Sequence, residues 1–358
     1  MTSVNTKQPT AIALFSGGGG LDLGFAAAGF DIRVSTDVDP VGCTTLEENM
    51  GGRKRFFSPH PVIAKDISSL SASDFLKAGE LNKGEVDIVI GGPPCQAFSV
   101  FGQRRGLGDP RGELVWEFLR IVRGLRPRAF VFENVYGLAS LHNGEVLKEL
   151  KRRLSMGGKY KVDAQTYELA AYGIPQWRKR VFIVGSHIGD APPRMRETHG
   201  IKKGLKPFRT VGEVLSGMPP PGNGLANHRG RVHGDGIIQR YQSMFFGMRD
   251  KHTRINRLDP SKPSYTIVVG SDKGGGKGHV HPYEPREVTP RESARLQTFP
   301  DWWEFSGNVR HMIRQVGNAV PPLFAAQYAS HVRRHVFGDK KPLAAKALTK
   351  KIGLNFLY

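Results

Sequence analysis

Apolar residues in the first half of the chain fall into short runs that alternate with segments of helical periodicity. The pattern predicts strands at 11–15, 31–36, 62–64, 86–90, 129–133, 162–169 and 181–184. Between them it predicts helices at 21–28, 41–49, 113–124 and 144–154. This alternation is typical of an α/β fold with a doubly wound, mostly parallel sheet and helices on both faces. We therefore expect a catalytic and cofactor-binding domain over residues 1–185.

The alternation stops near residue 185, and residues 186–290 are rich in glycine, proline and basic side chains. This segment holds 17 Lys and Arg against 9 Asp and Glu. An irregular stretch of this length is uncommon inside a compact domain unless it has a function. We expect a second, smaller, irregular domain with a basic face, in which the apolar run 264–269 forms an ordered strand.

Helical periodicity returns at 290–298, where a proline suits the first turn of a helix, and again at 323–336. The basic end, 340–351, is expected to be frayed or helical on the surface. Residues 291–358 are therefore expected to return to the catalytic domain.

The charge balance narrows the choice of partner. The 358 residues include 52 Lys and Arg against 32 Asp and Glu, a formal net charge of +20. Such an excess favours nucleic acid or another anionic surface through long-range attraction and counterion release. Two cysteines exclude a disulfide scaffold and fit a reducing cytoplasm. No signal-peptide core, membrane span or metal-ligand spacing is evident, so we expect neither membrane association nor a metal.

The first candidate for chemistry is Cys95, in the stretch GGPPCQAFSVFGQRRG that follows a buried strand. Two glycines allow a turn and two prolines stiffen it, so Cys95 is expected at the carboxyl end of a strand, where open α/β sheets bind ligands. A lone cysteine is usually a small buried hydrophobe. The basic loop that follows, with Arg104, Arg105 and Arg111, instead favours a nucleophile that acts on a polyanion.

A glycine run after the first strand is the second candidate. Phe15–Gly20 would let the backbone approach a cofactor at a helix N-terminus, and Asp37 ends the next strand, where an acid can bind ribose hydroxyls. Asp66 ends the third strand and either binds an adenine amino group or caps a helix. Dinucleotide, flavin and S-adenosylmethionine folds all share this plan.

Three more polar residues are placed at the same edge. Glu133 directly follows a buried strand, where burial would raise its pKa and make it a proton donor, although an N-cap or solvated acid is the commoner role. Strand alternation puts Arg178 and Arg180 on one face. Two guanidinium groups there suit a carbonyl oxygen, a carboxylate or phosphates, and a solvated basic face is the alternative.

Together these blocks resemble the DNA (cytosine-5)-methyltransferases along nearly the whole chain. The matching blocks, in the family's order, are ALFSGGGGLDLGF, GGPPCQAFSVFG, ENV, QWRKRVFIVG, RESARLQTFPDWW and QVGNAVPP. Ala13 and Gly18 depart from the family's usual residues, and neither departure removes a catalytic group. The resemblance implies an S-adenosylmethionine-dependent methyltransferase sheet with a target-recognition domain at 186–290.

The resemblance also implies a role for each matching residue. Cys95 would attack C6 of cytosine, Glu133 would bind N3 and the amino group, and Arg178 and Arg180 would hold the base and the catalytic residues. The implied cofactor contacts are Phe15, Gly17, Gly19, Asp37, Asp66, Pro94, Leu114, Asn318 and Val320. Gln96, Ser99 and Arg111 would belong to a loop that closes over the flipped base, and Thr266 would lead into the recognition contacts.

The implied function is methyl transfer to C5 of a flipped-out cytosine in a short duplex DNA sequence. The resemblance further implies a monomeric bacterial enzyme in the cytoplasm, associated with the nucleoid through DNA and paired with a restriction endonuclease. A tRNA cytosine-5 methyltransferase of the same fold and a catalytically silent DNA-binding module are the alternatives. A flavin or nicotinamide oxidoreductase would share the fold but would leave the Pro94-Cys95-Gln96 block unexplained.

Overall fold

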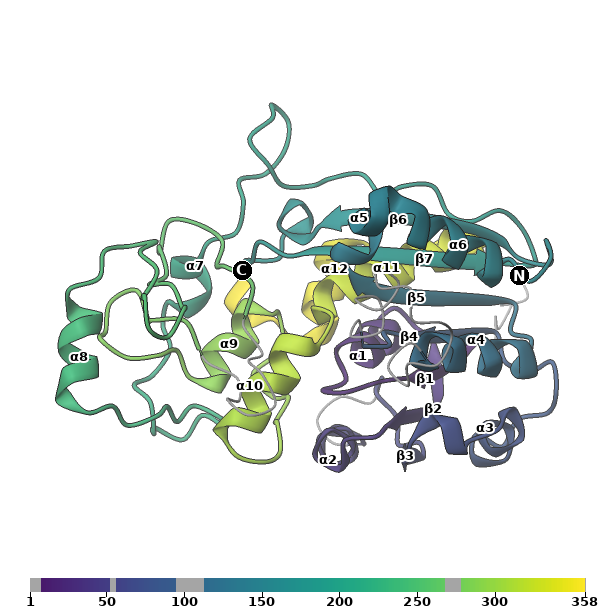
Figure 1. The fold of residues 1–358 in the computed structure, drawn as a ribbon, viewed down its shortest axis with the longest axis horizontal. Coiled ribbons are helices and arrows are strands. Elements are labelled where there is room, and N and C mark those ends of the chain that lie inside the picture. The colour runs from purple at the N-terminus through teal and green to yellow at the C-terminus, as the bar shows by residue number, and fades with distance from the viewer. Residues whose placement is uncertain (1–7, 52–55, 95–112, 268–277, 358) are drawn as a thin grey trace, which may run out of the picture.

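The computed structural model describes residues 8–51, 56–94, 113–267 and 278–357. Its centre is a seven-stranded sheet in the order β3-β2-β1-β4-β5-β7-β6 (Figure 1). Within this sheet β7 is antiparallel to both of its neighbours, and the other pairings are parallel. The strands are β1 (Thr10–Leu14), β2 (Asp31–Asp37), β3 (Val62–Ala64), β4 (Ile88–Gly91), β5 (Ala129–Val135), β6 (Lys161–Glu168) and β7 (Lys179–Ser186).

Helices cover both faces of the sheet. One hydrophobic cluster joins it to α1 (Gly20–Ala27), α2 (Pro40–Asn49), α11 (Pro322–His335) and α12 (Ala345–Ile352). A second cluster joins the other face to α3 (Ala72–Ala78), α4 (Glu113–Leu125) and α6 (Glu145–Leu154). The remaining helices are α5 (Gly137–Ser140), α7 (Val211–Leu215), α8 (Asp235–Gln242), α9 (Pro290–Leu296) and α10 (Val309–Asn318). The predicted doubly wound, mostly parallel sheet is confirmed.

The strand order reverses direction between the neighbouring strands β1 and β4. The loops that follow these strands, residues 15–19 and 91–94, therefore emerge side by side at the carboxyl edge of the sheet. Open α/β sheets bind their ligands at such a reversal point. The two glycine-rich blocks of the sequence, 75 residues apart along the chain, meet here.

The last part of the chain packs closely against the first helix. A Cβ added to Gly20 would lie 2.1 Å from the Val320 carbonyl oxygen, and one added to Gly24 would lie 2.3 Å from the Ala325 Cβ. Glycines on one face of α1 thus let α11 approach at backbone distance. Arg333 of α11 also donates from Nη1 to the carbonyl oxygens that end α1, those of Ala28 and Gly29, both at 2.9 Å.

The described residues of the range 186–290 have little regular structure beyond α7 and α8, and lie beside the sheet (Figure 1). They hold a small hydrophobic cluster of their own, formed by Tyr241, Met244, Ile255 and Val280. The strand predicted at 264–269 is wrong for the described residues up to 267, because Ser264 forms only an isolated bridge with Gln176. The backbone of Ser264 bonds to the loop at Pro175 and Trp177 instead of a neighbouring strand.

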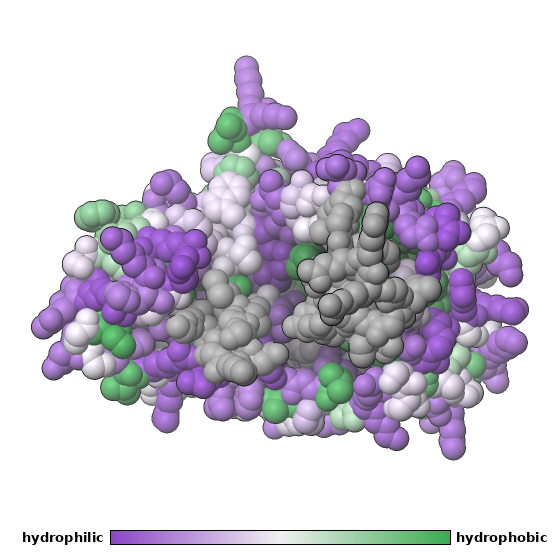
Figure 2. All heavy atoms as spheres, viewed as in Figure 1, coloured by the Kyte–Doolittle hydropathy of each residue, from purple (hydrophilic) through white to green (hydrophobic). Residues whose placement is uncertain are grey.

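Several helices differ from the sequence-based expectation, since α3, α5, α7, α8 and α10 were not predicted. The basic C-terminal segment, expected to be frayed or helical on the surface, forms the helix α12, and two of its side chains, Leu348 and Ile352, are buried. Hydrophilic residues cover most of the face seen in Figure 2. Among the described residues, no helix has the length and apolar character needed to cross a bilayer.

Candidate active site

The loop after β4 and the end of β5 lie against each other at the carboxyl edge of the sheet. A Cβ added to Gly92 would lie 2.8 Å from Oε2 of Glu133, so the carboxylate occupies space that any other residue at 92 would fill. The neighbouring Asn134 donates from Nδ2 to the Pro93 carbonyl oxygen at 2.9 Å. These contacts hold the Gly-Gly-Pro-Pro turn beside Glu133. Cys95, Gln96, Ser99 and Arg111 lie outside the described residues.

Glu133 forms a buried ion pair with Arg180. The Arg180 Nε lies 3.1 Å from Glu133 Oε1, and the two side chains are only 12% and 10% exposed. Burial raises the pKa of the Glu133 carboxyl, while the charges of Arg180 and Arg178 oppose this rise. A carboxyl group with a raised pKa beside an arginine can donate a proton to a ring nitrogen while the arginine stabilises an adjacent oxygen.

Arg178 is buried and points away from solvent. Its Nη2 donates to the carbonyl oxygens of Gly317 at 2.8 Å and Ala319 at 2.9 Å, at the end of α10. Burial, with the charge of Arg180, lowers the pKa of this guanidinium well below its usual range. Arg178 therefore fixes the QVGNAVPP segment to the strand that carries Arg180, and supports the site from behind.

Two glutamines that the sequence analysis did not select extend this support. Gln176 donates from Nε2 to Oε1 of Gln297 at 2.6 Å, and Gln297 donates to the carbonyl oxygens of Val316 at 3.0 Å and Ala319 at 2.7 Å. All these groups are buried, so each bond replaces one that water would otherwise make. Both glutamines lie in blocks that carry the family resemblance, which is the signal that could have marked them.

The loop after β1 has the geometry of a nucleoside-binding turn. Phe15 and Gly17 adopt positive φ angles of 57° and 51°. The Gly17 amide donates to Oδ2 of Asp37 at 2.7 Å, and the Asp39 amide donates to Oδ1 at 2.9 Å. Burial raises the pKa of Asp37. A Cβ on Gly17 would meet only Asp37 Oδ2, at 3.9 Å, so the space around Gly17 can accommodate a ligand.

The other glycine expected to contact the cofactor has a packing role. A Cβ on Gly19 would lie 2.6 Å from the Trp303 ring and 2.7 Å from Leu46, so protein side chains fill the space beside it. Of the remaining expected cofactor residues, Val320 is buried, Leu114 is half-buried, and Pro94 and Asn318 are exposed. These four side chains were proposed from resemblance and remain a prediction.

The sequence predicts that Asp66 either binds an adenine amino group or caps a helix, and the structure shows a capping contact. Asp66 precedes the short helix Ile67–Ser69, and its Oδ1 accepts from the Ser68 amide at 2.9 Å and hydroxyl at 2.8 Å. These bonds lower the pKa of Asp66. The carboxylate is exposed at the carboxyl end of β3, so capping leaves it available to an adenine amino group.

Thr266 connects the irregular region to the segment that leads into β7. Its hydroxyl donates to the Trp177 carbonyl oxygen at 2.6 Å, and the Trp177 amide donates to the Ser264 carbonyl oxygen at 2.8 Å. The His279 ring also contacts the Thr266 carbonyl oxygen at 3.0 Å. Thr266 therefore holds the 264–267 segment one residue away from Arg178.

A buried acid behind the cofactor loop was not selected from the sequence. Asp22 of α1 accepts at Oδ1 from the hydroxyls of Ser16 at 2.8 Å and Ser35 at 2.6 Å, and its Oδ2 has no hydrogen-bond partner among the described residues. The Ser35 hydroxyl also lies 2.9 Å from His60 Nε2. Burial raises the pKa of Asp22 and lowers that of His60. This network ties the Phe15–Gly19 turn to β2.

Comparison with known proteins identifies the family. The model of the family "C-5 cytosine-specific DNA methylase" matches residues 10–334. Type II methyltransferase M.XorII of Xanthomonas oryzae is 31% identical over 94% of this chain and 86% of its own length. Type II methyltransferase M1.HphI of Haemophilus parahaemolyticus is 34% identical over 90% of this chain and 86% of its own length.

Solved structures agree with this assignment. A candidate DNA modification methyltransferase encoded within an E. coli prophage superposes with a TM-score of 0.74 at 28% identity, covering 92% of this chain and all of that one. Dnmt2 of S. pombe superposes with a TM-score of 0.64 at 18% identity, covering 91% of this chain and 99% of that one, which shows a shared fold. From the match over residues 10–334, the chain belongs to the C-5 cytosine-specific DNA methylase family, and is an S-adenosylmethionine-dependent DNA (cytosine-5)-methyltransferase.

Proposed function

We propose that the enzyme methylates a flipped-out cytosine through a covalent bond between Cys95 and C6 of the base. The contact between Gly92 and Glu133 supports this most directly, because it places a buried acid against the turn that leads, three residues later, into Cys95. A thiol is a strong nucleophile even when only a small fraction is ionised. The acid therefore lies beside the turn that precedes the proposed nucleophile in the chain, at a ligand-binding edge.

In the proposed reaction the Cys95 thiolate bonds to C6 while Glu133 gives its proton to N3, so that C5 becomes electron-rich. S-Adenosylmethionine, when bound, supplies an electrophilic methyl group on a sulfonium. Transfer of the methyl group to C5 would break its bond to the sulfonium sulfur and leave a neutral thioether. A base would then remove the C5 proton, N3 would return its proton to Glu133, the Cys95–C6 bond would break, and the C5–C6 double bond would re-form. Arg180 donates to the cytosine carbonyl oxygen and stabilises the charge that develops on it.

We assign the cofactor to the turn after β1. The open space beside Gly17 and the desolvated carboxylate of Asp37 suit the methionine portion and the ribose hydroxyls. Phe15 would contact the adenine ring, and Asp66 its amino group. Pro94, Leu114, Asn318 and Val320 would complete the pocket.

Residues 186–290 are proposed to read the DNA sequence. The target atom is inaccessible inside a duplex, so flipping costs a few kcal/mol that protein–DNA contacts must offset. The basic excess of this region supports contacts to DNA. Its attachment through Thr266 to Trp177, directly before Arg178, supports a coupling of these contacts to the catalytic edge. Gln96, Ser99 and Arg111 would contact the DNA from the loop after Cys95.

The relatives named Type II methyltransferases support a role in restriction–modification. We propose that the enzyme acts as a monomer in the bacterial cytoplasm, on the nucleoid, and protects DNA from a partner endonuclease. Bisulfite sequencing of DNA from expressing cells tests this role. Complete methylation at one short motif is expected, and scattered modification would contradict it.

Covalent trapping tests the mechanism once that motif is known. A duplex with 5-fluorocytosine at the target position cannot lose a proton from C5, so the Cys95–C6 adduct should persist in denaturing gels when S-adenosylmethionine is present. Cys95→Ala should give no adduct, and Glu133→Gln should form it at least 100-fold more slowly. An adduct with Cys95→Ala, or normal turnover by it, would overturn the mechanism. Transfer of labelled methyl groups to tRNA, with none to duplex DNA, would favour the tRNA alternative.

A further inference from the structure

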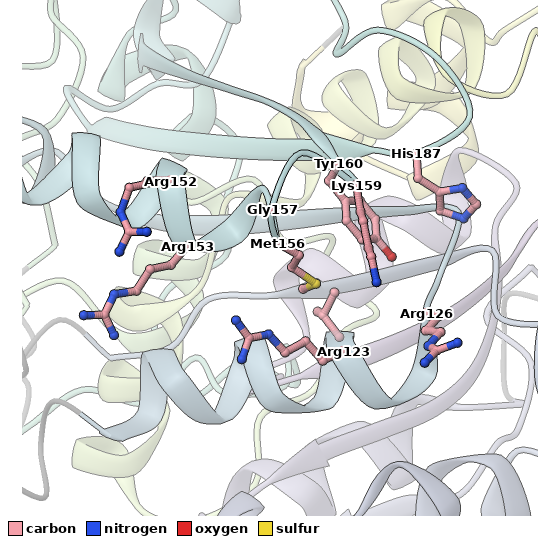
Figure 3. A pocket seen from close by; sticks show the side chains of 10 residues that line it. Arg123, Arg126, Arg152, Arg153, Met156, Gly157, Lys159, Tyr160 and His187 are labelled. Atoms are coloured by element: carbon pink, nitrogen blue, oxygen red, sulfur yellow. The ribbon is translucent and has the colours of Figure 1, made fainter.

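A basic groove lies at the amino edge of the sheet, opposite the active site. It has a volume of about 990 Å³ and runs between the C-terminal ends of α4 and α6 (Figure 3). Its lining includes Arg123 and Arg126 from the end of α4, Arg152 and Arg153 from α6, Lys159 from the turn into β6, and His187 after β7. No carboxylate is among its ten lining residues.

The groove keeps a net positive charge after its internal ion pairs are counted. Glu149 bonds Arg152 and Arg153, both at 2.7 Å, and neutralises one of the two charges. The side chains of Arg123, Arg126 and Lys159 make no hydrogen bond or ion pair with any described residue. Cations near a helix C-terminus can simply complement the helix dipole, which accounts for Arg123, Arg152 and Arg153. It does not account for Lys159 or His187, which lie outside the helices.

The floor of the groove is rigid and neutral. Tyr160 donates to the Pro127 carbonyl oxygen at 2.7 Å, and burial raises its pKa to about 12. The His187 ring stands edge-on to Tyr160, with ring centroids 5.5 Å apart. Cations therefore lie along the walls of a preformed surface, as an extended anion requires.

One wall residue occupies a backbone position that favours glycine. Arg126 follows α4 with φ of 51°, in the left-handed region that other side chains enter at a cost. An arginine at this position makes the backbone less stable than a glycine would, and its side chain lines one end of the groove (Figure 3).

The groove and the active site lie at opposite edges of the sheet. Arg180 begins β7 at the catalytic edge, and His187 directly follows the end of the same strand. Seven residues of extended chain span roughly 23 Å. Because the two sites lie on opposite edges of the sheet, a duplex bound at one leaves the other free.

We propose that this groove binds the phosphate backbone of a second duplex segment while the catalytic edge holds the target. Duplex DNA is the polyanion that this enzyme meets in its reaction, and it carries one charge per about 1.7 Å of axis. A second attachment raises the effective concentration of neighbouring DNA at the catalytic edge, so the enzyme finds targets faster on long DNA.

The test compares two triple variants of the full chain that remove the same charge. The groove variant is Arg123→Ala, Arg126→Gly and Lys159→Ala. The control variant is Lys340→Ala, Lys341→Ala and Lys346→Ala, around α12 on the other face of the sheet. Each protein is first saturated with a short target duplex, and then titrated with a fluorescent non-target duplex over a range of salt concentrations.

Wild type and the control should bind the second duplex, whereas the groove variant should bind it at least 10-fold more weakly. The slope of log affinity against log salt should fall by about 2 to 3, since each lost phosphate contact contributes about 0.9. Single-turnover methylation of the short duplex should not change. The proposal would be overturned if both variants bound the second duplex equally, or if the wild type bound one duplex only. It would also be overturned if inorganic tripolyphosphate displaced the second duplex and unlabelled duplex DNA at matched charge did not.

The single variant Arg126→Gly distinguishes a role of Arg126 in DNA binding from a role in folding. Glycine relieves the left-handed backbone, so the melting temperature should stay the same or rise while affinity for the second duplex falls. A lower melting temperature together with unchanged second binding would show that Arg126 serves the fold.

Discussion

Gly92 and Glu133 occupy each other's space: a Cβ at residue 92 would lie 2.8 Å from the Glu133 carboxylate oxygen. Real Cβ atoms do not approach an oxygen this closely, so either the loop or the carboxylate must move. The contact makes the position of the acid depend on a residue that has no side chain.

We therefore expect Gly92→Ala to lower methylation about 10- to 100-fold, because displacement of about 1 Å at a catalytic group can cost a factor of this size. The protein should still fold and bind S-adenosylmethionine. The measurement is single-turnover methylation of duplex DNA alongside cofactor binding by calorimetry.

Gly189→Ala is the matched control for this change. A Cβ on Gly189 would meet nothing within 4 Å, and its φ lies outside the left-handed region. This variant should retain full activity. Full activity in Gly92→Ala would show that the Glu133 position does not matter for the reaction.

Arg178→Lys should destabilise the protein, although the charge is kept. The Arg178 guanidinium donates from Nη2 to the carbonyl oxygens of Gly317 and Ala319 and from Nη1 to Oε1 of Gln176 at 3.4 Å. An ammonium on a shorter, differently shaped side chain cannot reach all three acceptors. Breaking a buried charged network of this kind costs about 2 to 4 kcal/mol.

Chemical denaturation measures this loss. Lys179→Arg, at the exposed neighbouring position, is the control and should leave the midpoint unchanged. If Arg178→Lys unfolds at the wild-type midpoint but has lost activity, Arg178 contacts the reacting groups and is not only a support.

Glu133→Gln should change how stability depends on pH. Because burial raises the pKa of Glu133 in the folded state, its stabilising protonated form is fully present below the unfolded value near 4.5 and is lost as pH rises through the folded pKa. Glutamine does not titrate. The melting temperature of Glu133→Gln relative to wild type should therefore rise between pH 4 and pH 8.

Glu149→Gln should change the pH dependence of stability in the opposite direction. The arginines beside Glu149 lower its pKa to about 2, so its contribution is present above the unfolded value and is lost only in acid. The melting temperature of this variant relative to wild type should stay level or fall over the same pH range. Parallel pH profiles for the two variants would contradict the environment assigned to Glu133.

Thr266→Val should reduce methylation up to about 10-fold. This is the effect expected when one hydrogen bond that contributes about 0.5 to 1.5 kcal/mol is lost. Valine keeps the shape of the threonine side chain but loses the hydrogen bond to the Trp177 carbonyl oxygen. The irregular region then loses one attachment to the segment that leads into β7. Thr266→Ser keeps the hydroxyl and should restore activity. Equal activity of the valine and serine variants would show that this bond does not position the DNA.

The sheet and most residues of the site could be predicted from the sequence alone. Strands and most helices follow from local periodicity and from caps such as the proline and threonine that begin α9, so their positions could be predicted within a few residues. Helix α10 also carries a signal that could have been used, since Val309, Met312, Ile313 and Val316 have helical spacing. The glycine-rich blocks and Glu133 were placed at one edge because parallel strands end on one side.

The role of each of these residues depends on long-range packing and could not be predicted from the sequence. Arg178 and Arg180 have the same spacing and chemistry in the sequence, yet one reaches carbonyl oxygens about 140 residues away and the other pairs with Glu133. The Trp303 ring leaves no room for a side chain at Gly19. Residues 264–267 bond to a distant loop instead of forming a strand. These outcomes depend on contacts between segments far apart in the chain, which local periodicity does not encode.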